Sequence, residues 1–315
     1  MTKLQSHFFI GLVKIPNRTV LAPMAGYTDA AMRTMASKFG VGLTITEMVS
    51  AKGLVYNPEK SLPLLVSPYD GVKSVQLFGH EPDYFYEATR SPHLNAFDII
   101  DINMGCPVPK IVRCGEGSAL LNNPMLAEQI VSETVRGAGC RPVTVKIRVG
   151  YAENDDVSVE FAKRMVGAGA QAITLHGRTK AQGYAGEADW DKIERLKDIL
   201  GVPVIGSGDV SENTASTLLE RADAIMIGRQ AVGNTRIFQN ILGGNLVGNT
   251  FDDMLEHFML MNKLYGERYA LVNFRHHVGG YLRGVRNSRD IKLALYSATT
   301  FKEAQAVIEN FVQQK

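Results

Sequence analysis

The chain has 315 residues, of which 45% are hydrophobic and 21% charged, and its formal net charge is +2. This is ordinary globular composition, long enough for one large domain and an appendage, and so small a net charge does not by itself indicate an anionic partner. The three cysteines lack CxxC spacing, and no apolar run approaches the length of a transmembrane helix, so we expect no metal, no secretory signal, no membrane partner and a cytoplasmic location.

Strand-like and helix-like segments alternate along the first 240 residues. Strands are expected at 19–22, 43–46, 74–78, 97–103, 143–148, 172–176, 202–205 and 224–227. Helices are expected at 28–39, from 82, and at 124–135, 157–166 and 190–200. Eight such units predict a (β/α)8 TIM barrel over residues 1–245. An open doubly wound sheet is the alternative, but no GxGxxG motif follows the first strand and polar residues follow nearly every strand.

The fourth predicted strand ends in an unusual stretch. Gly105 permits a backbone that other residues resist, and Pro107 cannot continue a ladder of hydrogen bonds, so Asn103 and Cys106 fall at the C-terminal end of the strand. A cysteine there can face a ligand, or it can be a small buried hydrophobe. The stretch alone leaves both readings open, because thiol reactivity depends on the surroundings.

Two glycine turns predict a phosphate site at the same end of the barrel. Residues 207–209 (Ser-Gly-Asp) follow the seventh strand, and Gly228-Arg229 follows the eighth. Backbone N–H groups at such turns bind phosphate oxygens, although either motif alone can also be a tight turn. Lys146 and Gln76 add a cation and an amide at other strand ends, so the set suits flavin mononucleotide (FMN).

The pattern changes from about residue 249. Helices are expected at 251–265, from 269 and at 297–312, with methionines packed inside, so we predict a small helical domain over 246–315. Basic residues gather in it: Arg268, Arg275, His276, His277, Arg283, Arg286, Arg289 and Lys292. This cluster can follow nucleic-acid phosphates or can be a solvated helix face, and charge alone favours neither.

These segments resemble the bacterial branch of the tRNA-dihydrouridine synthase family over nearly the whole chain. The matching motifs are Leu21-Ala22-Pro23-Met24-Ala25-Gly26-Tyr27-Thr28-Asp29, Glu47-Met48, Val75-Gln76-Leu77-Phe78-Gly79, Asp101-Ile102-Asn103-Met104-Gly105-Cys106-Pro107, Gly117-Ser118-Ala119-Leu120-Leu121, Val145-Lys146-Ile147-Arg148 and Leu175-His176-Gly177-Arg178-Thr179. The resemblance implies FMN as cofactor, NADPH as reductant and a tRNA uridine as substrate. One departure is Ser207, where the family usually has Asn.

The resemblance also implies a role for each matching residue. The cofactor-binding residues are Pro23, Met24, Ala25, Gln76, Lys146, His176, Ser207, Gly208, Asp209, Gly228 and Arg229. Cys106 is the proton donor, and Asn103 and Arg178 hold the target base. In the basic cluster, the resemblance favours RNA, with Arg283 and Arg286 as tRNA contacts.

We therefore expect an FMN-dependent enzyme that reduces the C5–C6 double bond of tRNA uridines to 5,6-dihydrouridine, with hydride from FMN and a proton from Cys106. The alternatives are an FMN oxidoreductase of a free pyrimidine or enone, a dihydrouridine synthase acting on ribosomal RNA, and a non-catalytic RNA-binding protein. A monomer is expected. The sequence leaves open which uridine is modified and whether NADPH or NADH is preferred.

Overall fold

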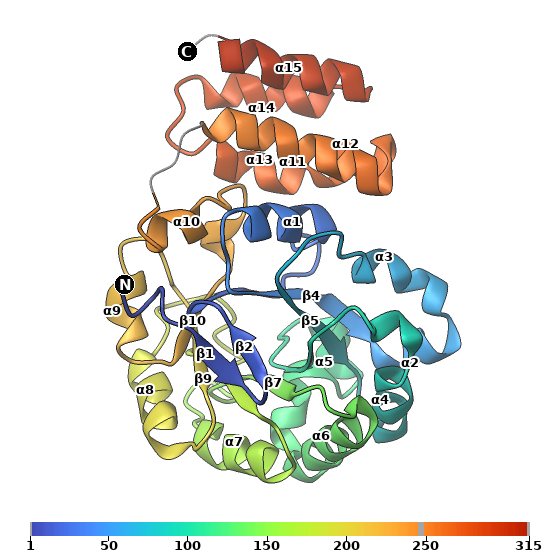
Figure 1. Ribbon diagram of the computed structural model, residues 1–315, viewed down its shortest axis with the longest axis vertical. Coiled ribbons are helices and arrows are strands. Elements are labelled where there is room, and N and C mark those ends of the chain that lie inside the picture. The colour runs from blue at the N-terminus through green and yellow to red at the C-terminus, as the bar shows by residue number, and fades with distance from the viewer. Residues whose placement is uncertain (1, 245–248, 314–315) are drawn as a thin grey trace.

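The larger part of the protein is a closed barrel of parallel strands, with the order β10-β3-β4-β5-β6-β7-β8-β9 (Figure 1). The computed structural model describes residues 2–244 and 249–313. The barrel strands are β3 (Thr19–Leu21), β4 (Leu43–Ser50), β5 (Val72–Phe78), β6 (Ile99–Met104), β7 (Val143–Arg148), β8 (Ala172–His176), β9 (Val204–Ser207) and β10 (Ala224–Ile227). The predicted barrel is confirmed, and the open sheet is wrong.

Helices surround the barrel. They are α1 (Ala30–Lys38), α2 (Ala51–Tyr56), α3 (Leu62–Leu65), α4 (Pro82–Thr89), α5 (Pro109–Arg113), α6 (Pro124–Ala138), α7 (Ser158–Gly167), α8 (Trp190–Ile199), α9 (Ala215–Leu219) and α10 (Ile237–Ile241). Asp29 caps α1 by accepting from Met32 N–H, while Thr28 instead bonds both backbone polar groups of Met24. The cap therefore starts the helix, and the threonine fixes the loop that precedes it.

An antiparallel hairpin that the sequence reading missed lies at the N-terminal ends of the strands. It consists of β1 (Phe8–Ile10) and β2 (Val13–Ile15). Its buried side chains, Phe8 and Ile10 among them, join the apolar cluster inside the barrel. Between the two strands, Gly11 has a φ of +55°, which favours glycine. The hairpin thus fills that end of the barrel and leaves the opposite end for chemistry.

A separate group of helices packs beside α1 and α10 (Figure 1). They are α11 (Thr250–Tyr265), α12 (Glu267–Asn273), α13 (Arg275–Tyr281), α14 (Ser288–Ser297) and α15 (Phe301–Gln313). The predicted start of the last helix at 297 is wrong, since α14 ends there. Of the methionines expected to be buried, Met254 and Met261 are, but Met259 is 49% exposed. The predicted domain boundary at 245/246 lies outside the described residues.

The helical part is docked firmly on the barrel. A buried ion pair joins Arg236, which precedes α10, to Asp253 of α11. Gly280 of α13 packs so close to the carbonyl of Val232 that an added Cβ would lie 1.8 Å from that oxygen. Ala31 of α1 belongs to the apolar core of the helical part. These contacts hold α11 and α13 against the segment that follows β10.

Candidate active site

Two adjoining cavities occupy the end of the barrel where the strands finish. One, of about 500 Å³, contains Cys106 and is called the thiol cavity. The other, of about 480 Å³, contains Gly208 and Gly228 and is called the glycine cavity. Both are lined by a shared set of residues: Pro23, Met24, Lys146, Arg148, Tyr184 and Arg229. The two cavities are therefore two halves of one mouth.

Most of the sequence-predicted site residues line this mouth. The thiol cavity receives Ala25, Gln76, Asn103 and Cys106 in addition to the shared residues. The glycine cavity receives His176, Ser207, Gly208, Asp209, Gly228 and Arg283. Arg178 lines neither cavity, and Arg286 lines a third one between the barrel and the helical part.

The loop after β3 is held from both sides. Gly26 N–H donates to Glu47 Oε2 (2.7 Å), and its carbonyl accepts from His276 Nδ1 (2.9 Å). The register of β4 shifts between Ile45 and Met48, so β4 continues to Ser50 beyond its predicted end. Glu47 lies within this irregular segment. The barrel and helix α13 together fix the loop that carries the predicted flavin-contacting residues.

A relay of hydrogen bonds joins the barrel interior to the Cys106 loop. Asp101 Oδ2 accepts from Gln76 Nε2 (2.6 Å), and Gln76 Oε1 accepts from Asn103 Nδ2 (2.8 Å). Asn103 Oδ1 then accepts from Cys106 N–H (2.9 Å). Because a carboxylate only accepts, Asp101 sets the orientation of both amides. Asp101 lies within the quoted sequence motif, but the sequence reading gave it no role.

The Cys106 thiol retains its proton at neutral pH. Burial raises its pKa above the ordinary value of 9.0, against the opposing effects of the Val108 N–H and of the charges on Lys146 and Arg148. Arg148 is itself tied to the loops, because it donates to the carbonyls of Gly105, Thr179 and Gly183. The thiol is therefore a weak acid on a loop that an arginine fixes in place.

Lys146 carries a charge that has no counter-ion in contact with it. Burial and, to a smaller extent, the nearby charge of Arg148 together lower its pKa to about 8, against the opposing effects of Asp101 and Cys106. Its ammonium group makes no ion pair or hydrogen bond within residues 2–244 and 249–313. Because it lines both cavities, Lys146 is placed to meet an electron-rich ligand that spans them.

The glycine cavity has the features of a ligand cradle. Gly208 has a φ of +124°, and an added Cβ would lie 2.5 Å from that of Ala188. The Cδ2–Nε2 edge of the His176 ring lies next to Gly208, and its Nδ1 is buried without a partner among the described residues. Burial, followed by the charges of Lys146 and nearby arginines, lowers the pKa of His176 well below 6.5, so the ring is neutral.

Asp209 joins two arginines at the rim. Its carboxylate accepts from Arg178 Nη2 (2.7 Å) and Arg229 Nη2 (3.1 Å). Arg178 also donates to the carbonyls of Ala185 and Gly186 and is only 2% exposed. The residue expected to hold the target base is thus engaged in holding the loop after β8 in this structure.

Similarity to known proteins establishes the family of the chain. Residues 20–315 match the family model described as dihydrouridine synthase (Dus). The chain belongs to the dihydrouridine synthase family. It is 39% identical over 276 residues to a probable tRNA-dihydrouridine synthase of Rhizobium leguminosarum bv. phaseoli, covering 86% of each chain. It is 36% identical over 315 residues to tRNA-dihydrouridine synthase B of Pasteurella multocida, covering 96% of this chain and 95% of the relative.

The fold is also shared with other enzymes. The chain is similar to the old yellow enzyme homologue of Zymomonas mobilis, with a TM-score of 0.58 and 16% identity, over 79% of this chain and 95% of that one. It is similar to histamine dehydrogenase from Rhizobium sp. 4-9, with a TM-score of 0.60 and 14% identity, over 82% and 51% of the two chains. Identities this low show a common fold and nothing further.

Two side chains of this dihydrouridine synthase line the mouth without having been predicted there. Tyr184 is 61% exposed, and the guanidinium groups of Arg148 and Arg229 lie 5.7 Å and 4.9 Å from the centre of its ring. His276 reaches the thiol cavity from α13, far along the chain. Tyr184 could have been predicted, because it lies a few residues after the His-Gly-Arg-Thr motif. Nothing in the sequence indicates that His276 lies at the mouth of the barrel.

Two further features concern membrane-spanning helices and metal sites. Within residues 2–244 and 249–313, no helix is both long enough and apolar enough to cross a membrane. Across the same residues, the His, Cys, Asp and Glu side chains form no group of three or more that could hold a metal ion.

Proposed function

We propose that this member of the family reduces the C5–C6 double bond of uridines in tRNA to 5,6-dihydrouridine, with FMN as cofactor and NADPH as reductant. One observation carries the proposal: a protonated thiol and an unpaired ammonium group line the same cavity, which opens into a cationic cradle. The names of the two curated relatives support the choice of tRNA as substrate.

The residues fit FMN. Lys146, Arg148, Arg229 and Arg283 bring four positive charges to the glycine cavity, against the single carboxylate of Asp209. An excess of positive charge suits a phosphate. Ser207 and the backbone of Gly208 and Gly228 line the same cavity and offer the rest of such a ligand polar and close backbone contacts.

When bound and reduced, the flavin supplies the hydride that adds to C6 of the uracil. Cys106 Sγ gives its proton to C5, and the resulting thiolate regains a proton from solvent. The relay through Asn103 holds the Cys106 backbone in place for this transfer. Lys146 stabilises the negative charge that develops on C5 and the C4 oxygen. A raised thiol pKa suits this role, since the group must be protonated when it acts.

The helical part is the proposed tRNA-binding domain, with residues 246–315 as its extent. A base within folded RNA must flip out to reach a barrel mouth, so the enzyme has to grip the surrounding RNA. Exposed arginines of the helical part, Arg286 and Arg289 among them, can follow its phosphates. We propose that the enzyme works as a monomer in the cytoplasm, where tRNA is modified. Sedimentation of the purified protein tests the monomer.

The function is tested by incubating the purified, yellow protein with unmodified tRNA and NADPH and measuring dihydrouridine by mass spectrometry. We expect dihydrouridine in tRNA, and little turnover of ribosomal RNA or free uridine under the same conditions. Equal turnover of free uridine would favour the alternative of a small-molecule oxidoreductase. A preparation that retains no flavin would contradict the proposal.

A further inference from the structure

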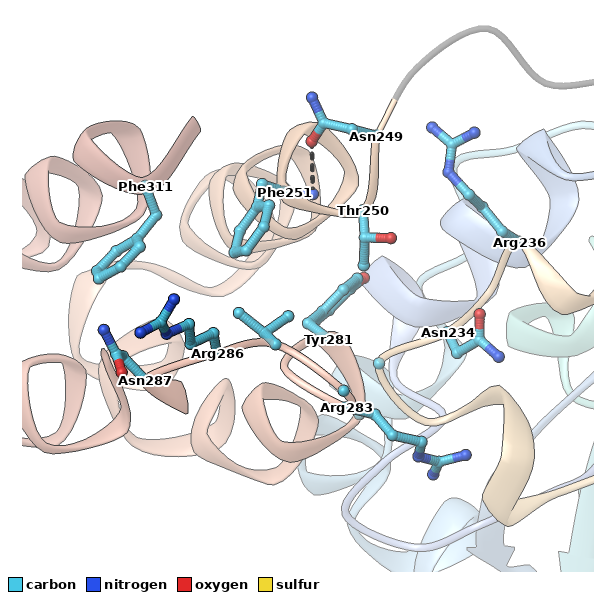
Figure 2. Close-up of a pocket in the computed structure, with 14 residues that line it drawn as sticks. Asn234, Arg236, Asn249, Thr250, Phe251, Tyr281, Arg283, Arg286, Asn287 and Phe311 are labelled. Atoms are coloured by element: carbon cyan, nitrogen blue, oxygen red, sulfur yellow. Dashed lines mark hydrogen bonds between the residues drawn. The ribbon is translucent and has the colours of Figure 1, made fainter. Parts of the chain in front are cut away.

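Arg283 joins the helical part to the glycine cavity. It lies just after α13 and lines both that cavity and an interdomain cavity of about 830 Å³, whose other lining residues include Asn234, Tyr281 and Arg286 (Figure 2). It is the residue common to these two cavities. A side chain from the helical part therefore takes part in the cradle that the barrel forms.

A hydrogen bond to Gln230 holds the Arg283 side chain toward the barrel. Arg283 Nη1 donates to Gln230 Oε1 (2.8 Å), and Gln230 directly follows Gly228-Arg229 in the turn after β10. Figure 2 shows the guanidinium of Arg283 directed toward the barrel, whereas that of Arg286, three residues later, lies on the side of Phe311. The two arginines on which a tRNA contact was predicted therefore face different surroundings.

The other guanidinium groups of the glycine cavity are already engaged. Arg148 donates to three backbone carbonyls, and Arg229 pairs with Asp209. Arg283 donates to a neutral amide, so its positive charge has no counter-ion within the described part of the chain. Its Nε and Nη2 donors remain available to a ligand in the cavity.

We propose that Arg283 binds the terminal phosphate of the flavin cofactor, so that the helical part completes the cofactor site as well as meeting RNA. The inference rests on the proposed function, because it takes FMN as the ligand of the glycine cavity. A guanidinium suits a phosphate through paired, charge-assisted hydrogen bonds. Loss of the contact should therefore affect FMN but not riboflavin, which has the same ring system without the phosphate.

The test measures binding of FMN and of riboflavin to the full-length apoprotein by quenching of flavin fluorescence. Variant R283A should bind FMN about tenfold more weakly, as expected for the loss of one charge-assisted hydrogen bond at a half-open site, and riboflavin within about twofold of the native affinity. R283K, which keeps the charge, should recover part of the FMN affinity. R286A is the matched control and should bind both flavins as the native chain does.

Equal losses of FMN and riboflavin affinity in R283A would overturn the inference, because they would indicate a merely structural role. Native FMN affinity in R283A, together with weakened tRNA binding, would overturn it too and assign Arg283 to RNA. A native chain that binds neither flavin would contradict the proposed function itself.

Discussion

At the residue scale, the mouth of the barrel combines an acid that keeps its proton with a base that holds its proton weakly. Burial raises the pKa of Cys106 and lowers that of Lys146 to about 8, so both are protonated near neutral pH. The step that needs the thiol proton should persist as pH rises through neutrality and be lost only above the raised thiol pKa. Loss of the Lys146 ammonium charge, which is half complete near pH 8, should come first.

Replacing Lys146 with Met should stabilise the apoprotein and weaken FMN binding. A folded-state pKa of about 8 against an ordinary 10.5 means that the unfolded chain binds this proton more tightly. The charged group thus destabilises the native apoprotein at neutral pH, and stability is regained as pH rises from about 8 to 10.5. Urea unfolding of K146M should show a gain of about 1–2 kcal/mol near neutral pH that shrinks at high pH. Loss of stability near pH 7 would contradict this reading.

At the element scale, strand ends were predictable and contacts between distant elements were not. Regular alternation located the eight strands, and glycine turns located the cradle. The hairpin that contains Gly11 was missed because each of its strands has only three residues. The sequence could not show that β4 continues past Glu47, that Asp101 orients a relay, or that α13 brings His276 to the thiol cavity. Those features depend on packing between segments far apart in the chain.

The relay from β6 gives a prediction about Asp101. Variant D101N keeps an oxygen that can accept from Gln76, whereas D101L leaves the buried amide without a partner. We expect D101L to lower uridine reduction about tenfold or more through displacement of the Cys106 loop, with a smaller effect on flavin reduction by NADPH. D101N should stay near native on both assays. Stopped-flow measurement of the two half-reactions separates them, and equal activity of D101L and D101N would rule out the relay.

Helix α13 gives a second prediction, for His276. Its Nδ1 holds the carbonyl of Gly26, and asparagine can place an N–H in a similar position. H276A should raise the dissociation constant of FMN about fivefold, the effect of one side-chain hydrogen bond, and H276N should restore most of the affinity. Titration of the apoproteins provides the comparison. If the asparagine variant were as weak as alanine, the contact with Gly26 would not be what matters.

At the scale of the whole molecule, the helical part contacts the mouth of the barrel and also lines the cavity between the two parts. Its contacts with Gly26 and Gln230 reach the mouth of the barrel, while Arg286 lines the cavity between the two parts. An RNA that lies across this junction would therefore touch elements that also hold the cofactor. On the proposed function, one small helical domain would both contact a folded RNA and help to complete the cofactor site.

Charge reversal at Arg286 should weaken tRNA binding and leave flavin binding unchanged. Arg286 is exposed and has no ion pair among the residues that the structure describes, so R286E changes the field toward RNA without breaking a described contact. We expect about tenfold weaker affinity at low salt and a salt dependence reduced by roughly one phosphate contact. K302E, at an exposed site on α15, applies the same change of charge as a control. Indistinguishable tRNA affinities for the two variants would remove Arg286 from the RNA-binding surface.

The most direct test of the account asks whether Cys106 supplies the proton. The enzyme is first reduced with NADPH without oxygen and then mixed with unmodified tRNA, and reoxidation of the flavin is followed by absorbance. Variant C106A should accept electrons from NADPH normally but reoxidise with tRNA at least about 100-fold more slowly than the native enzyme. C114A, which removes a nearby exposed thiol, should behave as the native enzyme does. Reoxidation of C106A at the native rate, with dihydrouridine formed, would contradict the account.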